Sequence, residues 1–244
     1  MKSRYMILMT IYGVFLTIDC HFANYPIVDM LQVDALAETD ILMALLDSVN
    51  GYNGLLKMLV LYTLPVLFGV YFLSYKEVSY VIVRYSIKEK FRQEEIKKII
   101  LVSVGFTILH QIISFIYVSS NISRELLMKY PFVLYTIVAG IIAILFYIQT
   151  GLLYHIISDY IKADLLAFVF MFCINFIQHI LIKYRIVKFW ISGSDFLVAF
   201  DFFEGKVSVS IIIFTIIRSI IVTVALYMIS QMIFEKKDIM KYEK

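Results

Sequence analysis

The stretch 132–157, FVLYTIVAGIIAILFYIQTGLLYHII, decides the fold class of this chain. It contains no Asp, Glu, Lys or Arg, and it exceeds the roughly 20 residues that an α-helix needs to cross about 30 Å of hydrocarbon. Further apolar runs lie at 5–22, 58–75, 99–118, 165–182 and 209–234. The sequence therefore predicts an all-α, polytopic membrane protein with six transmembrane helices that form a single domain, 1–244.

The composition favours the same class. Of the 244 residues, 61% are hydrophobic and 17% are charged, whereas an ordinary soluble domain has about 45 to 50% and about 25%. The net charge of +3 gives no basic surface of the size that nucleic-acid binding requires, so we expect no nucleic-acid partner. Cys20 and Cys173 lie in or beside apolar runs and indicate neither a disulfide framework nor a zinc site.

The distribution of basic residues predicts the orientation. With the N-terminus inside, the cytoplasmic segments hold 14 Lys and Arg residues and the external segments hold 7. Because basic residues in short loops resist translocation, this ratio favours an N-in, C-in topology. Lys183, Arg185 and Lys188 oppose it.

Two external segments differ in character. Residues 23–56 hold five carboxylates and no Lys or Arg, which is typical of a translocated loop. The segment 183–208 is apolar and aromatic, and it predicts either an ordinary packed external loop or an interfacial or re-entrant segment before the sixth span. Pro65 lies inside the second span and predicts a kink there.

The basic stretch 76–98 follows the second span and is expected to face the cytoplasm. Its apolar residues recur at helical spacing, which predicts one face of a short amphipathic helix, with Lys88, Lys90 and Arg92 following on a solvated stretch. Such a helix could lie on anionic lipid or bind in a groove of a partner protein.

The same stretch carries a family resemblance. The segment 80–90, YVIVRYSIKEK, is similar to the coupling helix after the second span of exporter-type (type 2) ABC transporter permeases, and FEKKDI at 234–239 is similar to the charged tail of that family. The six-span layout and the long acidic loop after the first span resemble the small permeases of bacteriocin, lantibiotic and amphipathic-peptide exporters of Gram-positive bacteria.

This resemblance implies a function and its partners. The chain would be the permease subunit of an ABC transporter in the bacterial cytoplasmic membrane. It would export hydrophobic or amphipathic peptides, for peptide secretion or for self-immunity and antimicrobial peptide resistance. The resemblance assigns ATPase coupling to Tyr80, Arg84, Tyr85, Lys88 and Lys90.

The expected partners are two separate ABC ATPase subunits, a second permease subunit that is identical or homologous, membrane lipid and the peptide substrate. The chain has no G-x-x-x-x-G-K-[ST] phosphate-binding motif, so we expect no cofactor on this chain and ATP on the partner subunit.

Polar residues inside the predicted spans are candidates for a translocation path, because polar groups in a bilayer are costly unless they face protein or water. The candidates are His110, Gln111, Gln149, Asn175 and Arg218. Arg218 could snorkel to the interface, pair with a carboxylate such as Asp19, or contact substrate. Asn175 could instead join helices by hydrogen bonds as a structural contact.

Two other classes of protein remain open. Glu94-Glu95, Phe106-x-x-x-His110 and His155-x-x-x-Asp159 are similar to scattered motifs of CAAX-type intramembrane proteases, but Ile99 stands where that family has an Arg. A non-catalytic immunity or accessory membrane protein is the other alternative. We expect a transport subunit with no catalytic residues and no metal site, because this chain lacks the common hydrolase motifs.

Overall fold

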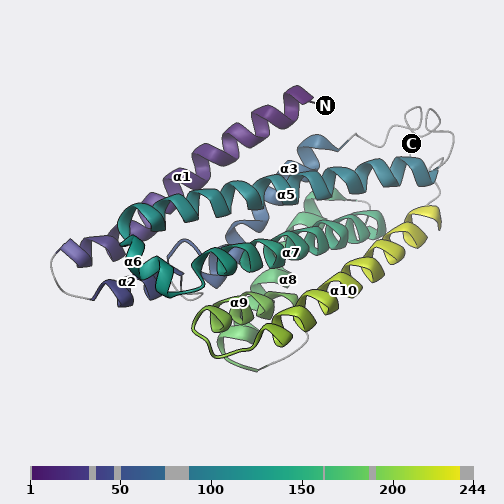
Figure 1. The fold of residues 1–244 in the computed structure, drawn as a ribbon. Helices are drawn as coiled ribbons and strands as arrows, with labels where there is room; N and C mark the ends of the chain where they lie inside the picture. Colours follow the sequence, from purple (N-terminus) through teal and green to yellow (C-terminus); the bar gives the residue numbers. More distant parts are fainter. Residues whose placement is uncertain are drawn as a thin grey trace.

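The computed structural model describes residues 2–32, 37–46, 51–74, 88–161, 163–186 and 191–236, and these ranges are helical with short turns and contain no strand. The helices in chain order are α1 (Lys2–Gln32), α2 (Glu38–Leu46), η1 (Lys57–Leu61), α3 (Thr63–Leu73), α5 (Lys88–Asn121), α6 (Arg124–Lys129), α7 (Phe132–Ile161), α8 (Asp164–Lys183), η2 (Ser192–Ser194), α9 (Asp195–Phe203) and α10 (Val209–Lys236). Figure 1 shows the long helices side by side, with the start of α1 and the end of α10 toward the same end of the bundle.

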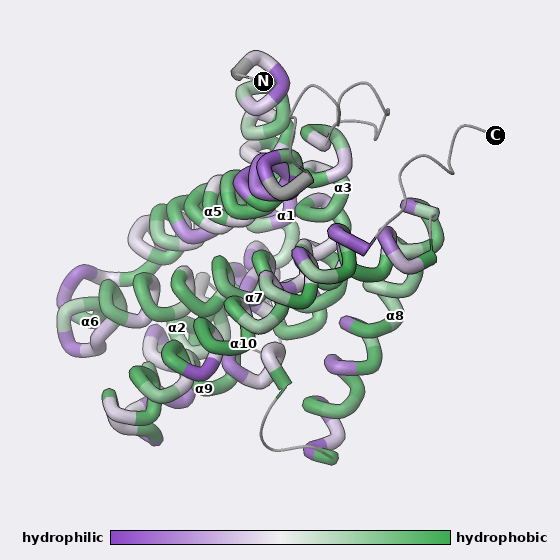
Figure 2. Tube along the Cα trace, turned by 90° about the vertical axis from the view of Figure 1, so that its right-hand side faces the viewer, coloured by the Kyte–Doolittle hydropathy of each residue, from purple (hydrophilic) through white to green (hydrophobic). Residues whose placement is uncertain are grey.

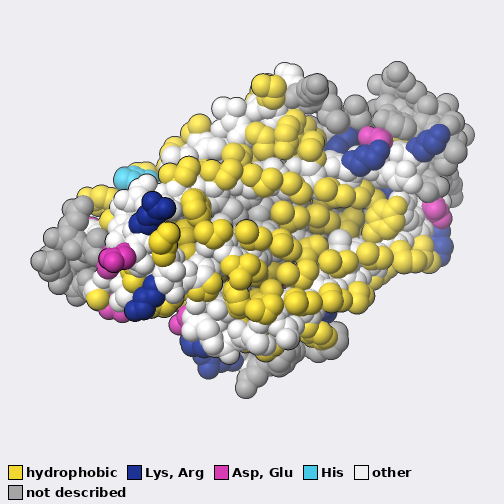
Figure 3. All heavy atoms as spheres, in the orientation of Figure 1, with side chains coloured by type: hydrophobic (Ala, Val, Ile, Leu, Met, Phe, Trp, Pro, Cys, Tyr) yellow, Lys and Arg dark blue, Asp and Glu magenta, His cyan; other side chains and the backbone are white. Residues whose placement is uncertain are grey.

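Five helices are long and apolar enough to cross a membrane: α1, α5, α7, α8 and α10. Their outward faces carry large exposed hydrophobic side chains, and Figure 3 shows hydrophobic side chains over the middle of one face with charged side chains toward its two ends. In Figure 2 the hydrophilic colours gather at α6 and at the beginning of α5. This is the surface of a membrane protein, because a soluble monomer rarely exposes so large an apolar patch.

The predicted second span, 58–75, is present as a shorter, interrupted helix. The apolar segment Lys57–Leu73 begins as the π-helix η1 and continues as α3. Pro65 has no N–H to donate to the carbonyl of Leu61. The wide turn immediately before it closes with the N–H of Tyr62 donating to the carbonyl of Lys57, at 2.8 Å. A π-turn thus lies just upstream of Pro65, and the kink expected there stays a prediction.

The segment 23–57 is more ordered than the acidic loop we expected. The helix predicted at 5–22 continues as α1 to Gln32. The short helix α2 follows, and it buries Ile41, Leu42, Leu45 and Leu46 almost completely. This apolar face, at positions i, i+1, i+4 and i+5, packs inward. The acidic residues of α2 lie in its first turn, where a negative charge interacts favourably with the helix dipole.

The predicted third span began at Ile99, but α5 begins eleven residues earlier, at Lys88. The basic stretch before Ile99 is therefore continuous with the membrane helix. Glu94–Lys97 and Glu95–Lys98 ion pairs, each three residues apart, support helix in this charged part.

The segment before the predicted sixth span contains the short helix α9, which packs on α7 and α10 and buries Phe196, Ala199 and Phe203. Helix α9 ends at Phe203, and Gly205 follows with a φ of 75°, which suits glycine. The N–H of Lys206 donates to the carbonyl of Asp201 at 2.8 Å. This is the turn that reverses the chain into α10. The aromatic side chains of Phe196 and Phe203 are thus packed against the bundle.

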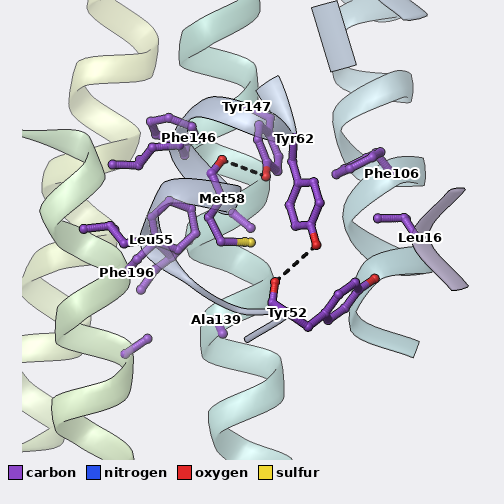
Figure 4. Close-up of a cluster of buried hydrophobic side chains, with 14 of the residues drawn as sticks. Leu16, Tyr52, Leu55, Met58, Tyr62, Phe106, Ala139, Phe146, Tyr147 and Phe196 are labelled. Carbon is purple, nitrogen blue, oxygen red and sulfur yellow. Dashed lines mark hydrogen bonds between the residues drawn. The ribbon is translucent and has the colours of Figure 1, made fainter. Parts of the chain in front are cut away.

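Helix α7 is the centre of the bundle, with α5, α8, α9 and α10 around it. Figure 4 shows the aromatic core on its inner side, where the ring of Phe106 contacts those of Tyr62 and Tyr147, and Phe146 contacts Tyr147. The hydroxyl of Tyr147 donates to the carbonyl of Met58 at 3.1 Å. That carbonyl belongs to the π-helical turn, so the irregular backbone of η1 is fixed by α7.

Candidate functional site

The segment assigned to ATPase coupling is described only at its end. Tyr80, Arg84 and Tyr85 lie outside the described residues. Lys88 is the first residue of α5, and Lys90, two residues further on, is exposed. The amphipathic helix expected over this segment is therefore a prediction that the structure leaves untested.

A buried ion pair lies directly beyond this segment. Nη2 of Arg92 on α5 is 2.5 Å from Oδ2 of Asp159 on α7, and the two side chains are 1% and 3% exposed. The guanidinium also lies over the ring of Phe234 on α10, 4.9 Å from its centroid, and Phe91 stacks on the same ring at 5.8 Å. We define Arg92, Asp159 and Phe234 as the Arg92 clamp, because they join the ends of three spans.

The prediction that Arg92 lies on a solvated stretch was wrong. Helix α5 starts before it and turns Phe91, Arg92 and Glu95 toward the bundle. A sequence signal was present, since Asp159 stands at the end of the fourth apolar run and can satisfy one buried cation.

The carboxylates of the protease-like motif are engaged in ion pairs. Glu94 pairs with Lys97 at 2.6 Å on the surface, and Glu95 pairs with Lys98 in the interior. Asp159 holds Arg92. Among the described residues no group of three His, Cys, Asp or Glu side chains is placed to hold a metal ion.

Arg218 pairs with Asp195, and not with the suggested Asp19. Its guanidinium donates from α10 to the carboxylate at the start of α9, and the Asp195 side chain is 3% exposed. Burial raises the pKa of Asp195 from its ordinary value of 3.8 to about 6, although Arg218 acts in the opposite direction. The pair holds α9 against the last span.

Two other candidates for the translocation path make hydrogen bonds between helices. Nε2 of Gln149 on α7 donates to the carbonyl and the hydroxyl of Ser219 on α10, both at 2.9 Å. Nδ2 of Asn175 on α8 donates to Oγ1 of Thr63 on α3 at 3.0 Å. The structural interpretation of Asn175 as a contact between helices is confirmed.

A polar cluster that the sequence analysis missed joins α1 to the π-helical turn. Nζ of Lys57 donates to both carboxylate oxygens of Asp19, at 2.8 and 3.0 Å, and the hydroxyl of Tyr62 donates to the same carboxylate. The Tyr62 hydroxyl is also 3.2 Å from the carbonyl of Tyr52 (Figure 4). Lys57 and Asp19 could have been noticed as opposite charges at the edges of consecutive spans.

The remaining candidates, His110 and Gln111, are neighbours on α5 with different surroundings. The His110 ring stacks on Tyr52 with centroids 4.3 Å apart and meets the edge of Tyr62 at 5.2 Å. Gln111 lines a small cavity of ≈ 20 Å³ together with Asn53, Met58 and Tyr135, which is room for a water molecule. The structure thus brings His110 to the Tyr52–Tyr62 cluster and leaves Gln149, Asn175 and Arg218 at separate contacts.

Comparison with models of protein families finds no match, and comparisons with curated proteins and with solved structures find none either.

Proposed function

We propose that this chain is the membrane-spanning permease subunit of an exporter-type ABC transporter, which moves hydrophobic or amphipathic peptides out of the cytoplasm or the bilayer. A separate ATPase subunit supplies the energy. The resemblance of 80–90 and 234–239 to the coupling helix and tail of that family motivates the proposal. The bundle of apolar helices is compatible with it.

The observation that best supports the proposal is the Arg92 clamp. A permease needs a rigid connection from the segment that an ATPase would push to the spans that must move. Arg92 lies four residues after the start of α5 and is bound to α7 by an ion pair and to α10 by a cation–π contact. Because a buried ion pair resists separation, a displacement of the start of α5 would be transmitted to both helices.

In this mechanism two permease subunits dock two ATPase subunits through residues 76–98. Binding and hydrolysis of ATP by those subunits would move the start of α5. The path that holds the substrate would then open alternately to one side of the membrane and to the other.

The decisive experiment is a mild-detergent pull-down of the tagged chain from its native membrane, followed by mass spectrometry. We expect a protein with a Walker A motif in near-stoichiometric amount. Recovery of the intact, folded chain without any such protein would reject the permease function and favour a stand-alone immunity or accessory protein.

The coupling residues can be tested in the same preparation. Arg84→Ala combined with Tyr85→Ala should release the ATPase subunit or abolish stimulation of its activity by the permease. Arg124→Ala is the matched control, because Arg124 begins the short helix α6, which follows the far end of α5. It should leave the binding and the stimulation of the ATPase unchanged.

A further inference from the structure

Four polar residues form a line along one buried face of α5. Ser103, Thr107, His110 and Ser114 follow one another at spacings of four, three and four residues, and they are 0%, 1%, 1% and 5% exposed. At about 1.5 Å per residue the line covers roughly 16 Å of the helix, about half the thickness of the hydrocarbon core. We call these four residues the α5 polar stripe.

Two side chains of the stripe make no hydrogen bond within the described part of the chain. Oγ of Ser103 and Oγ1 of Thr107 are buried without a partner there. The imidazole of His110 interacts with the backbone of Tyr52, and neither of its ring nitrogens bonds a side chain of the described residues. The hydroxyl of Ser114 accepts from Nδ2 of Asn53 at 3.3 Å.

Six hydroxyl groups elsewhere in the bundle behave differently, although the buried hydroxyl of Ser230 on α10 is, like those of Ser103 and Thr107, without a partner among the described residues. A serine or threonine in a membrane helix usually donates to the carbonyl four residues earlier, which satisfies it without any neighbour. Six hydroxyls do so: Thr10, Thr17, Thr63, Ser120, Thr136 and Thr223. Ser103 and Thr107 do not, so their hydroxyls are left available for a partner that comes from outside the helix.

The polar groups that hold the fold together are found at other places. Gln149, Asn175 and Arg218 all have partners on neighbouring helices. Unpaired buried polar groups are rare in folded proteins and destabilise the state in which they occur. A second state in which α5 parts from its neighbours and the stripe is solvated or bound would relieve this penalty.

We propose that the α5 polar stripe is the substrate-contacting wall of the translocation path, and that it hydrogen-bonds the backbone amide groups of a peptide when the bundle opens. This inference rests on the proposed transport function. The stripe offers neutral donors and acceptors without a carboxylate or guanidinium, which suits amide N–H and C=O groups better than it suits a free ion.

Cysteine labelling in native membrane vesicles tests the proposal. In a background in which Cys20 and Cys173 are replaced by alanine, Ser103→Cys and Thr107→Cys place thiols on the stripe. Ile112→Cys gives a thiol on the outward face of α5, and Ala143→Cys gives one in the packed interior of α7. A membrane-impermeant methanethiosulfonate needs water and thiolate, so it reacts only with an opened, hydrated path.

We expect the labelling rates of Ser103→Cys and Thr107→Cys to rise at least tenfold when Mg-ATP is added, with no rise for the two controls. A synthetic amphipathic Leu/Lys peptide should slow this labelling. Unchanged labelling of both stripe positions during ATP hydrolysis would overturn the proposal. So would an equal rise at Ala143→Cys, because that would indicate general loosening of the bundle.

A second pair of variants does not depend on the reagent. Ser103→Ala with Thr107→Val keeps the side-chain shape and removes the unpaired hydroxyls, so we expect unchanged or higher thermal stability and at least a fivefold lower transport rate. Wild-type transport by this variant would reject the stripe as a substrate contact. The pull-down reports the ATPase and these variants report the stripe, so failure of the stripe proposal can be told apart from failure of the transport function.

Discussion

At the scale of single residues, the molecule separates charges that hold helices together from polar groups that remain unpaired. The Arg92 clamp joins three helices, α5, α7 and α10, and the Arg218–Asp195 pair joins the consecutive helices α9 and α10. A buried ion pair contributes little compared with an apolar contact of the same shape, but removal of one partner leaves a charge buried and uncompensated. The pairs therefore determine which helices can move together.

Arg92→Ala should destabilise the protein by about 3 to 5 kcal/mol, because the Asp159 carboxylate would stay buried without the guanidinium that pairs with it. The double variant Arg92→Ala, Asp159→Ala should lose less than the sum of the single changes. Thermal or denaturant unfolding in mild detergent measures these differences. The exposed pair is the control, since Glu94→Ala with Lys97→Ala should cost under about 1 kcal/mol. Additive losses for Arg92 and Asp159 would contradict the clamp.

The pH dependence of stability should reveal Asp195. Its pKa is raised by burial to about 6, against an ordinary value of 3.8 in the unfolded chain. The folded state therefore binds this proton more tightly, and the stability that Asp195 contributes is fully present below about pH 4 and lost as the pH rises through 6. Its magnitude is on the order of 2 to 3 kcal/mol.

Asp195→Asn should remove this contribution, so the difference in melting temperature between variant and wild type should change between pH 4 and pH 7. A constant difference for Asp195→Asn across the same range would mean that the carboxyl group titrates normally.

At the scale of elements, α1 is attached to the bundle through glycines. A Cβ on Gly69 of α3 would overlap the hydroxyl of Tyr12 on α1. That hydroxyl donates to the carbonyl of Pro65 at 2.6 Å, so the ring cannot swing aside without losing the bond. Gly105 of α5 makes a similar close approach to Tyr5 and Met9. Close approach of the backbones is how membrane helices gain packing energy.

Gly69→Ala should therefore destabilise the protein by about 1 to 3 kcal/mol, with α1 displaced from α3. Gly13→Ala on α1 is the matched control. A Cβ there meets nothing within 4 Å, and the change should be neutral or stabilising by up to about 1 kcal/mol. Tyr12→Phe combined with Gly69→Ala should restore part of the loss, and the absence of any rescue would argue against this contact. Melting temperatures in detergent measure all three.

At the scale of the whole molecule, the number of membrane crossings decides the orientation of the two ends. Five helices are long enough to cross, and the segment Lys57–Leu73 is shorter. Its 17 residues extend for about 25 Å, near the lower limit for a span. Six crossings would put both ends on one side, whereas five would put them on opposite sides.

Reporter proteins fused at the two ends of the chain test whether it crosses the membrane five or six times. With six crossings and the basic residues inside, a fluorescent protein fused at either end should fluoresce and alkaline phosphatase fused after Lys244 should be inactive. Alkaline phosphatase inserted at Gly205, in the turn between α9 and α10, should be active. Active phosphatase at the C-terminus together with a fluorescent N-terminus would indicate that Lys57–Leu73 does not cross.

The sequence by itself determined that this is a helical membrane protein, and it located the five long spans. Apolar runs of 18 residues or more have no other stable arrangement in a membrane, because every backbone amide in hydrocarbon must be bonded within its own helix. The kink expected at Pro65 stays a prediction, and the π-turn of η1 just before it was not foreseen. It could not foresee that α5 begins at Lys88, since charged residues that pair along a helix resemble a solvated loop in hydropathy.

Only the tertiary structure decided which polar residues are paired. His110, Gln149, Asn175 and Arg218 look alike in sequence, as polar residues in apolar runs. Three of them bond to neighbouring helices, while the His110 ring nitrogens bond no side chain of the described residues. The distinction depends on the rotation of each helix and on the identity of its neighbours. These are set by packing between residues 23 to 112 positions apart, which no local pattern contains.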